Sequence, residues 1–375
     1  MRKFDLSRLF LILSMAILTL APSAAQSVSR DDVAKDTRFK PTFDRFQLLI
    51  KTQDDSLVKR LPYGKNTDKY VVMSDWHLGN SRRADYFGKN IDMIGEVLKY
   101  YQIRKYRFLL LGDVEDFHGF SMKTIEDAHG DIYGSFKDYG LEKVFRVFGN
   151  HDFEWGLNDP LAKKRTEPAS EAIILKSDDP AFNGPEIFLT HGQQAEDRIE
   201  DDVQFVRTMT WIEKMWASLV GKPRASMFSV AATGFDVKDA IYSLCADRLN
   251  EVIICGHTHY PIFSQKYPDL RTIYDLAERT ASSCLRQWLE ERALVIKGYI
   301  HFWTGNIREY TAAINTDRKL LSKKYFNSGA CCFIDGITLL EIEGKTIRLV
   351  FWNNDDKCKG TSEIIFEGDI RDLTR

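Results

Sequence analysis

The stretch "KVFRVFGNHD" (143–152) joins an apolar run to a glycine and three polar side chains. Four other stretches have the same form: "YVVMSDWH" (70–77), "RFLLLGDVED" (107–116), "EIFLTHG" (186–192) and "EVIICGHTH" (251–259). Apolar runs of this length that end in polar turns predict buried strands. A polar turn that closes a strand would explain any one of them. Five such ends of the same composition in one chain favour a shared site.

The segment between the first two of these strands predicts a helix, and the alternation indicates an α/β fold. "FGKNIDMIGEVLKYYQI" (87–103) spaces its apolar residues along one helical face. Sheets of this class bind ligands at the carboxyl ends of their strands, where the polar clusters fall. Near the C-terminus, "CCFIDGITLLEIEGKTIRLVFWNN" (331–354) predicts strand, turn and strand, and "EIIF" (363–366) predicts a further strand. We expect these C-terminal strands to form a second sheet packed on the first.

Two stretches, 195–248 and 263–322, are expected to be helical insertions. The first carries an amphipathic stripe with a 4-3-4-3 spacing. The residues of the stripe are Phe205, Met209, Ile212, Trp216 and Leu219. Ordinary packing against the core accounts for such a stripe. The alternative is a cap that covers the site and holds an apolar part of the substrate.

The first 25 residues are typical of a secretory signal peptide. A basic start precedes the apolar run "LFLILSMAILTL" (9–20) and small residues that fit cleavage after Ala25. An uncleaved N-terminal membrane anchor is the alternative, but the run is shorter than the roughly 20 residues that a spanning helix needs. No later segment of the sequence reads as a membrane span. We therefore expect an exported protein, periplasmic or extracellular, with an arm at 26–64 and one domain over 65–375.

Charge and cysteine content narrow the class of protein further. Removal of residues 1–25 takes away three of 52 basic and one of 54 acidic residues, which leaves 49 against 53. A slightly acidic chain is a poor match to a nucleic-acid-binding protein. The six cysteines have no zinc-finger spacing, and six in 375 residues do not make a disulfide scaffold, although export permits disulfides.

The donor groups at the five strand ends are carboxylates, amides and imidazoles, which suit Mn, Fe or Zn at a hydrolytic centre. The motifs resemble those of the calcineurin-like metallophosphoesterase family, whose signature is D-x-H, GD-x-x-D, GNH(D/E), H-G and GH-x-H. This chain has DWH, GDVED, GNHD, HG and GHTH in that order, and "NSG" (327–329) resembles a later family segment. The resemblance implies an α/β fold, a four-layer α/β/β/α sandwich of two mixed sheets with helical cap insertions.

The resemblance also implies two divalent metal ions, which would be Mn, Fe or Zn. The matching ligands are Asp75, His77 and His259 for one ion, Asn150, His191 and His257 for the other, and Asp113 as the bridge. A bridging carboxylate holds two cations roughly 3.5–4 Å apart, and the pair lowers the pKa of a shared water. The resulting hydroxide is expected to attack phosphorus in line. The neutral donors leave positive charge on the centre, which attracts the phosphate.

The family resemblance gives two residues beside the ligands a role in proton transfer. His151 matches the residue that faces the leaving-group oxygen, and Asp116 matches the carboxylate that orients this imidazole. Asp152 is expected to hold the turn. The glycines that open these motifs are expected to permit a tight backbone.

The remaining polar candidates lie outside the five motifs. Arg82, Arg83 and His118 are candidates for substrate contact, and a solvated surface position is the alternative for each. His129 and His301 have no motif around them and are expected to be structural. The sequence "HGQQ" (191–194) replaces the common "HGH" of the family, which affects local substrate contacts rather than the ligand.

The expected function is metal-dependent hydrolysis of a phosphomonoester or a phosphodiester. The partner would be a phosphorylated small molecule, lipid or nucleotide, and nucleic acid is disfavoured by the low basicity. The alternatives on the same site are a nuclease and a nucleotide or lipid pyrophosphohydrolase. A non-catalytic binding module should have lost ligand positions, and this sequence has lost none.

Overall fold

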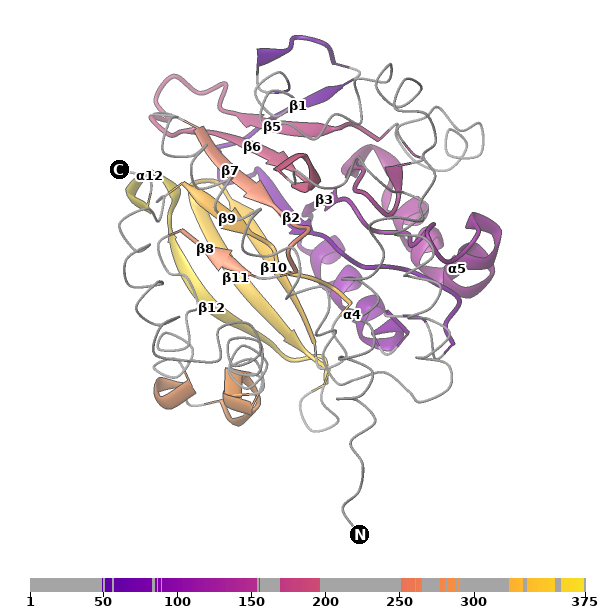
Figure 1. Cartoon of the computed structure of the whole chain (residues 1–375). Coiled ribbons are helices and arrows are strands. Elements are labelled where there is room, and N and C mark those ends of the chain that lie inside the picture. Colours follow the sequence, from indigo (N-terminus) through magenta and orange to yellow (C-terminus); the bar gives the residue numbers. More distant parts are fainter. Residues whose placement is uncertain are drawn as a thin grey trace, which may run out of the picture.

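The structure is a computed structural model. It describes residues 49, 51–55, 57–82, 85, 87–88, 90–153, 155, 169–195, 251–259, 261–264, 277–280, 282–287, 289–290, 324–332, 336–354 and 359–373. Two sheets of six strands each pack face to face in this part of the chain (Figure 1). We call them sheet I and sheet II. The α/β class and the sandwich of two mixed sheets are therefore confirmed.

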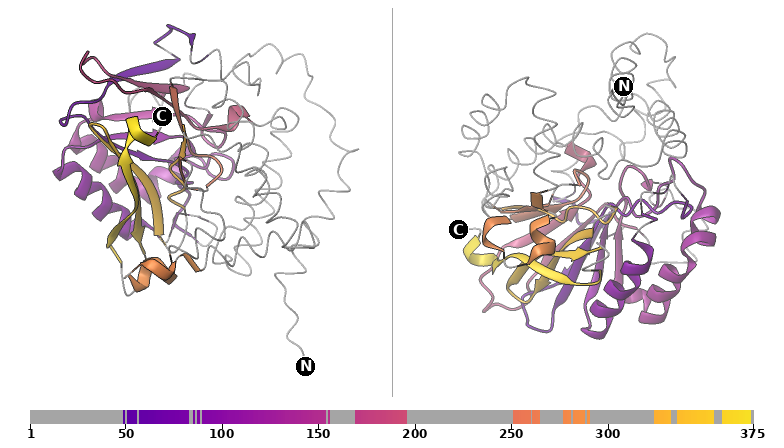
Figure 2. Two further views of the ribbon diagram at one scale, coloured as in Figure 1. Left: turned by 90° about the vertical axis from the view of Figure 1, so that its left-hand side faces the viewer. Right: turned by 90° about the horizontal axis from the view of Figure 1, so that it is seen from below.

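Sheet I contains three of the five motif strands. Its strand order is β12-β11-β10-β2-β3-β4. The bounds are β2 (Lys69–Met73), β3 (Arg107–Leu111), β4 (Val144–Val147), β10 (Gly336–Glu343), β11 (Thr346–Asn353) and β12 (Ser362–Asp369). The first three run parallel, and the last three are antiparallel to their neighbours. Helices α4 (Ile91–Ile103) and α5 (Met122–Tyr139) connect the parallel strands and cover one face of the sheet (Figure 2).

Sheet II contains the other two motif strands, in the order β1-β5-β6-β7-β9-β8. The bounds are β1 (Val58–Pro62), β5 (Ala172–Lys176), β6 (Glu186–Thr190), β7 (Glu251–Cys255), β8 (Ile262–Phe263) and β9 (Tyr325–Asn327). Because β6 and β7 are parallel, their carboxyl ends lie at the same edge. The short helices are η2 (Leu141–Lys143), η5 (Gln193–Ala195) and α12 (Ile370–Leu373).

Two apolar cores follow from the alternation of side chains along the strands of sheet I. Val71 and Met73 of β2 pack with residues of α4 and α5, whereas Tyr70 and Val72 pack with residues of sheet II. Both faces of the strand are buried, so its sequence is apolar throughout rather than alternating. Each such side chain contributes about 1.5–3 kcal/mol by burial, which makes the strands a rigid base for the loops at their ends.

Helix α5 begins and ends at residues suited to helix termini. The Ser121 side chain accepts a hydrogen bond from the Thr124 N–H at 3.2 Å and caps the first turn. Gly140 ends the helix with a φ of 108°, a value that side chains disfavour. The helix is kinked at His129, whose φ and ψ are −128° and 26°.

The C-terminal strands correct one expectation, because they do not form a separate sheet. β10 pairs antiparallel with β2, with Leu340 opposite Val72, so these strands extend sheet I. The second sheet is built from β1 and from β5 to β9 instead. Hydrophobic pattern identifies a strand but not the neighbour with which it pairs, so the sequence could not separate these two arrangements.

The expected arm at 26–64 also contains part of a sheet. β1 pairs parallel with β5, with Val58 opposite Ala172, so sheet II begins before residue 65. This edge strand carries the half-exposed Lys59 and Arg60, so its sequence is polar and mixed and was interpreted as part of an arm.

The expected insertions at 195–248 and 263–322 lie mostly outside the described residues, as do the stripe residues and the proposed cap. Residues 277–279 and 283–287, within the second range, are helical. Among the described residues, no helix has the length and apolar character needed to cross a membrane.

Candidate metal centre

The five motifs meet where the carboxyl ends of parallel strands from both sheets lie together. Sheet I contributes the loops after β2, β3 and β4, and sheet II contributes those after β6 and β7. Asp75 N–H donates to Gly112 O at 3.1 Å within sheet I, and Gly256 N–H donates to His191 O at 2.9 Å within sheet II. His257 N–H donates to the Asp75 carboxylate at 3.0 Å and thereby joins the two groups of loops.

Asp75 and Asp113 each hold a neighbouring loop with one carboxylate oxygen. Asp75 Oδ2 accepts from His257 N–H at 3.0 Å, and Asp113 Oδ1 accepts from His151 N–H at 2.8 Å. Asp75 Oδ1 is buried and has no donor in hydrogen-bond geometry among the described residues. An unsatisfied buried carboxylate oxygen is costly, so this atom marks a place that a cation fits.

A first set of donors surrounds that oxygen. His259 Nε2 lies 3.1 Å from Asp75 Oδ1 and 3.1 Å from His77 Nε2. His77 Nε2 is also 3.8 Å from Asp113 Oδ2. Ligand atoms that are each about 2.1 Å from one ion lie about 3.0–3.4 Å from each other. His259 is thus spaced from His77 and from the Asp75 oxygen as a ligand is from its neighbours on one ion.

A second set of donors shares Asp113. Its Oδ2 atom lies 3.2 Å from His191 Nε2, which lies 3.2 Å from Asn150 Oδ1. His191 donates its Nδ1–H to Leu111 O at 2.7 Å, so the neutral ring has its lone pair on Nε2. The ligand atoms of His257, Asp113 and His191 lie within 4.8 Å of one another. When the His191 ring is neutral, acceptor atoms of His191, Asp113 and Asn150 face one another, an arrangement that suits a cation among them.

The electrostatics of the centre favour that positive charge. Burial would raise the pKa of Asp113, but the surrounding imidazoles, His191 first, hold it well below its ordinary value. Burial would lower the pKa of His191, but the Asp113 carboxylate outweighs it and raises this pKa to about 9. Burial lowers the pKa of His77 to about 3 and keeps that ring neutral. Protons or cations must balance the carboxylates, and the set of imidazole, carboxylate and amide donors fits divalent metal ions.

The backbone is left-handed at five of the seven positions that match the family's ligands. The φ angles are 54° at Asp75, 50° at His77, 52° at Asp113, 65° at His257 and 54° at His259. Only eight non-glycine residues of the described part of the chain have a positive φ, and these are five of them. The left-handed region costs a residue with a Cβ about 1–2 kcal/mol, and such strain concentrates at functional sites. The rigid strands beneath the loops hold this conformation in place.

Two glycines are required because carboxylates approach them closely. A Cβ on Gly149 would lie 2.2 Å from Asp113 Oδ1, and one on Gly256 would lie 2.6 Å from Asp75 Oδ2. A methyl group at either position would displace a carboxylate of the centre. These glycines thus provide space for the donor groups, whereas Gly112 also has a positive φ of 79°.

His151 and Asp116 form a pair beside the two donor sets. His151 Nδ1 lies 3.2 Å from Asp116 Oδ1, and the His151 side chain is 20% exposed while Asp116 is buried. The His151 ring stands edge-on to His77, with centroids 4.6 Å apart. His118 lies against the same ring at 4.2 Å. Because Nδ1 of His151 pairs with Asp116, Nε2 is the atom that would exchange a proton with a substrate.

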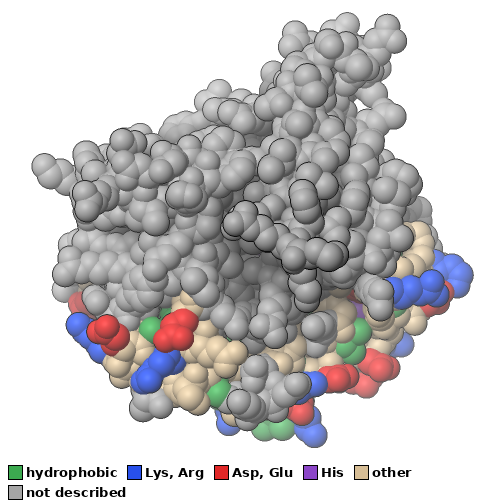
Figure 3. All heavy atoms as spheres, turned by 60° about the horizontal axis from the view of Figure 1, so that its bottom comes forward, with side chains coloured by type: hydrophobic (Ala, Val, Ile, Leu, Met, Phe, Trp, Pro, Cys, Tyr) green, Lys and Arg blue, Asp and Glu red, His purple; other side chains and the backbone are tan. Residues whose placement is uncertain are grey.

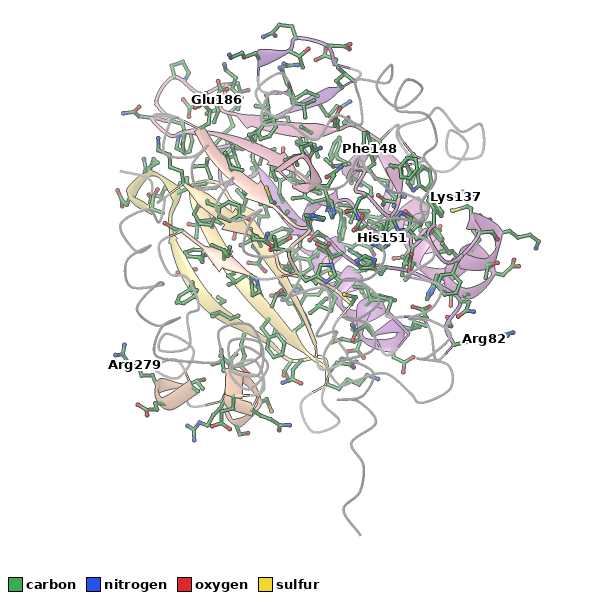
Figure 4. The ribbon with its side chains drawn as sticks, in the orientation of Figure 1. Arg82, Lys137, Phe148, His151, Glu186 and Arg279 are labelled. Carbon is green, nitrogen blue, oxygen red and sulfur yellow. The ribbon has the colours of Figure 1, made fainter. Side chains whose placement is uncertain are left out.

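The structure separates the candidates for substrate contact. His118 lies against His151, in the neighbourhood that a leaving group would enter. Arg82 is exposed, and Figure 4 shows its side chain at the periphery, directed away from His151. The structure therefore does not bring Arg82 to the centre. Arg83 lies outside the described residues.

Two residues that support the centre were not found by sequence reasoning. Asn327 Nδ2 donates to Gly256 O at 2.6 Å and holds the loop that carries the last two histidines. Cys332 Sγ lies 3.9 Å from His259 Nδ1, and the ligand atoms of Cys332, His259 and His77 lie within 4.8 Å of one another. The available signal was the "NSG" segment (327–329), which marks where the chain returns to the site after β9.

A hydrolase whose metal centre is built from imidazole, carboxylate and amide donors is the class of protein that this fold and site define. The sequence profile of the calcineurin-like phosphoesterase family matches residues 69–261, more than half of the chain, and the chain belongs to this family. It is a hydrolase that acts on phosphoric ester bonds; its family is metal-dependent, and its described residues include His and Asp clusters that could bind metal ions.

Solved structures match the chain as well. One is the crystal structure of a conserved uncharacterized protein, a predicted phosphoesterase, from Streptococcus pneumoniae TIGR4. It is 12% identical, with 80% of this chain and 98% of that chain covered, at a TM-score of 0.26. A search among curated proteins found no match. The family assignment rests on the sequence profile together with the site.

Proposed function

We propose that this protein uses two divalent metal ions, Mn, Fe or Zn, to hydrolyse a phosphomonoester or a phosphodiester outside the cytoplasm. The observation that carries the proposal is the position of Asp113 Oδ2, which lies 3.2 Å from His191 Nε2 and 3.8 Å from His77 Nε2. One oxygen common to two donor sets suits a pair of ions roughly 3.5–4 Å apart. The assigned ligands are Asp75, His77 and His259 for one ion, Asn150, His191 and His257 for the other, and Asp113 for both.

The two ions would supply positive charge for the phosphoryl oxygens and a water nucleophile of lowered pKa. The protein contributes only two carboxylates among seven donors, so the loaded centre retains a net positive charge that attracts a phosphate. The left-handed backbone fixes the donors before substrate arrives, which avoids reorganisation during the reaction.

His151 is assigned the proton donor to the leaving oxygen. Its Nδ1 is held by the buried Asp116, at 3.2 Å, which leaves Nε2 as the donating atom. His118, with its ring centroid 4.2 Å from that of His151, is assigned a contact with the leaving group. Arg83 remains a candidate for substrate contact on sequence grounds alone.

Two features support an exported location. Residues 1–25 have the pattern of a signal peptide, with cleavage after Ala25. Cys284 is disulfide-bonded, a state favoured by oxidising compartments. Expression with the native N-terminus, followed by cell fractionation and N-terminal sequencing, tests this part of the proposal. A membrane-bound chain that still begins at Met1 would contradict it and favour the anchored alternative.

The slight excess of acidic over basic residues supports a small phosphorylated substrate over a nucleic acid. On the rim of described residues that Figure 3 leaves in view, Lys and Arg side chains lie close to Asp and Glu side chains rather than in one basic patch. Binding to a nucleic-acid backbone depends on such a patch. A plasmid-nicking assay decides this point, and nicking that requires the intact ligands would favour the nuclease instead.

Purified protein assayed with para-nitrophenyl phosphate and bis-para-nitrophenyl phosphate, with and without a chelator, tests the function. We expect hydrolysis that the chelator abolishes and that added Mn, Fe or Zn restores, with two ions per chain by elemental analysis. Asp113→Asn is the matched inactive control, because it nearly preserves the size of the proposed bridging group. A chain that binds metal but hydrolyses neither ester nor a pyrophosphate would be a binding module.

A further inference from the structure

The buried ion pair of Glu115 and Arg146 adjoins the Asp116–His151 pair, because Glu115 directly precedes Asp116 in the chain. Arg146 Nη2 donates to both oxygens of Glu115, at 2.8 Å and 2.6 Å. The Tyr133 hydroxyl donates to Oε1 at 2.8 Å, and Trp155 Nε1 donates to Oε2 at 2.8 Å. Glu115 is 0% exposed and Arg146 is 3% exposed. One carboxylate thus receives four hydrogen bonds in the interior of the protein.

Those hydrogen bonds come from segments that lead to the site. Glu115 precedes Asp116 in the loop after β3, and Arg146 lies in β4, just before the GNHD turn. Trp155 follows that turn, and its ring lies 4.5 Å from the Arg146 guanidinium. Glu115 therefore links the two loops that carry Asp116 and His151, in addition to the hydrogen bonds from His151 N–H to Asp113 and from Val114 N–H to Asp152.

Backbone hydrogen bonds carry this attachment to the reacting groups. Asp116 N–H donates to Leu78 O at 3.1 Å, and Phe117 N–H donates to His151 O at 3.0 Å. A shift of the loop at Glu115 would therefore move Asp116 relative to His151. Because Leu78 directly follows His77 in the chain, the same shift would also displace His77, a member of the first donor set.

Stability alone does not explain a charged pair at this position. Desolvation of two charges offsets much of their attraction, and well-packed apolar residues often stabilise a core equally well. Sheet I contains a second, less buried pair: Glu341 accepts from Tyr101 at 2.8 Å and from the partly exposed Arg348 at 3.4 Å. The substitution Glu341→Gln provides a control of the same chemical kind.

We propose that Glu115 is a positioning residue, which sets the geometry of the Asp116–His151 pair through its bonds to Arg146 and Trp155. This inference rests on the proposed function only where it concerns turnover. It predicts two results for Glu115→Gln. The environment of the His151 ring should change, and the rate of proton donation to the leaving group should fall more than the rate of nucleophilic attack.

The first test is NMR of protein labelled with ¹⁵N-histidine, with the His151 signals assigned from the spectrum of His151→Ala. We expect Glu115→Gln to shift the His151 ring signals and Glu341→Gln to leave them in place. This readout needs no activity, so it decides the inference even if no phosphoester is hydrolysed. His151 signals that stay in place in Glu115→Gln, or that move equally in both variants, would overturn the proposal.

The second test compares para-nitrophenyl phosphate with phenyl phosphate, whose leaving oxygen needs the proton more. We expect Glu115→Gln to lower kcat for phenyl phosphate about 10-fold more than for the nitro ester, as removal of an orienting partner does elsewhere. Glu341→Gln should lower both equally or not at all. Equal losses on both esters in Glu115→Gln would make the residue merely structural.

Trp155→Phe is the milder variant if Glu115→Gln fails to fold. It removes one donor to Glu115 and keeps a ring beneath Arg146. We expect the same direction of change in the His151 signals and in the ratio of the two kcat values, at smaller size. Unchanged signals and an unchanged ratio in this variant would overturn the inference.

Discussion

Two aspartate–histidine pairs in this protein have nearly the same length and different surroundings. His151 Nδ1 lies 3.2 Å from Asp116, and His129 Nε2 lies 3.1 Å from Asp85. The His151 side chain is 20% exposed and lies against His77, whereas the His129 side chain is fully buried. The pair itself therefore does not determine the role of the histidine.

The difference lies in what the aspartates do. Asp85 also accepts backbone hydrogen bonds, from Gly79 at 3.1 Å, from Ser81 at 2.6 Å and from Phe87 at 2.8 Å. It closes the loop that follows the DWH motif, and His129 anchors it from α5. Asp116 instead faces an imidazole that lies beside His77 of the metal centre. One pair organises backbone, and the other is assigned to proton transfer.

The largest effect should come from His151→Ala. Loss of a general acid typically lowers turnover by about 10²- to 10⁴-fold, and no ligand is removed, so metal content should stay unchanged. Steady-state kinetics and elemental analysis on the same preparation check both statements. The control is His129→Ala, which should retain turnover per folded molecule. Loss of a metal ion in His151→Ala would show that His151 is a ligand.

Asp116→Asn should have the next largest effect, a loss of kcat of about 10- to 100-fold. The amide keeps the shape of the side chain but no longer stabilises a charged imidazole. Asp85→Asn removes the same charge from the other pair and should leave kcat within about twofold. Equal losses of kcat in the two variants would contradict the distinction between the pairs.

Asn150→Ala separates ligand from acid within a single motif. Asn150 Oδ1 lies 3.2 Å from His191 Nε2, so its removal should weaken one metal ion and leave the His151–Asp116 pair intact. We expect activity to fall at limiting metal and to recover largely at excess metal, measured by titration with Mn or Zn. Activity that does not recover, with both ions still bound, would contradict the assignment of Asn150 as a ligand.

The sequence located the strand ends that the structure brings together better than it located the sheets that carry them. Each donor follows an apolar run within a few residues, so local pattern is sufficient to find it. The pairing of β10 with β2 depends on contacts between Leu340 and Val72, which are far apart in the chain. No local pattern encodes such a partner, and the C-terminal strands were therefore assigned to the wrong sheet.

The supporting groups of the site were missed for a related reason. Glu115 lies within the GDVED motif at a variable position, and only the fold reveals that Arg146 and Trp155 lie against it. His129, which was expected to be structural, is buried against Asp85, a partner 44 residues away in the chain. Sequence motifs predict the residues that contact a ligand, whereas the residues that support them are recognised only from their proximity in the folded structure.

The smallest effect on turnover, and a large effect on stability, should come from the buried pair. Removal of one partner leaves the other buried polar group unsatisfied, which typically costs about 1–3 kcal/mol in the free energy of unfolding. A double-mutant cycle of Asp85→Ala and His129→Ala, followed by urea unfolding, measures the coupling between the two side chains. We expect a coupling energy of about 1–3 kcal/mol for this pair.

The same cycle on Asp116→Ala and His151→Ala should give a smaller coupling in stability, since the partly exposed ring is solvated in either state. Its coupling should appear in kcat instead, because Asp116 acts on the reaction only through His151. A larger coupling in stability for the exposed pair than for the buried pair would reverse the comparison. In that case, burial would no longer explain why one pair supports the backbone and the other is assigned to proton transfer.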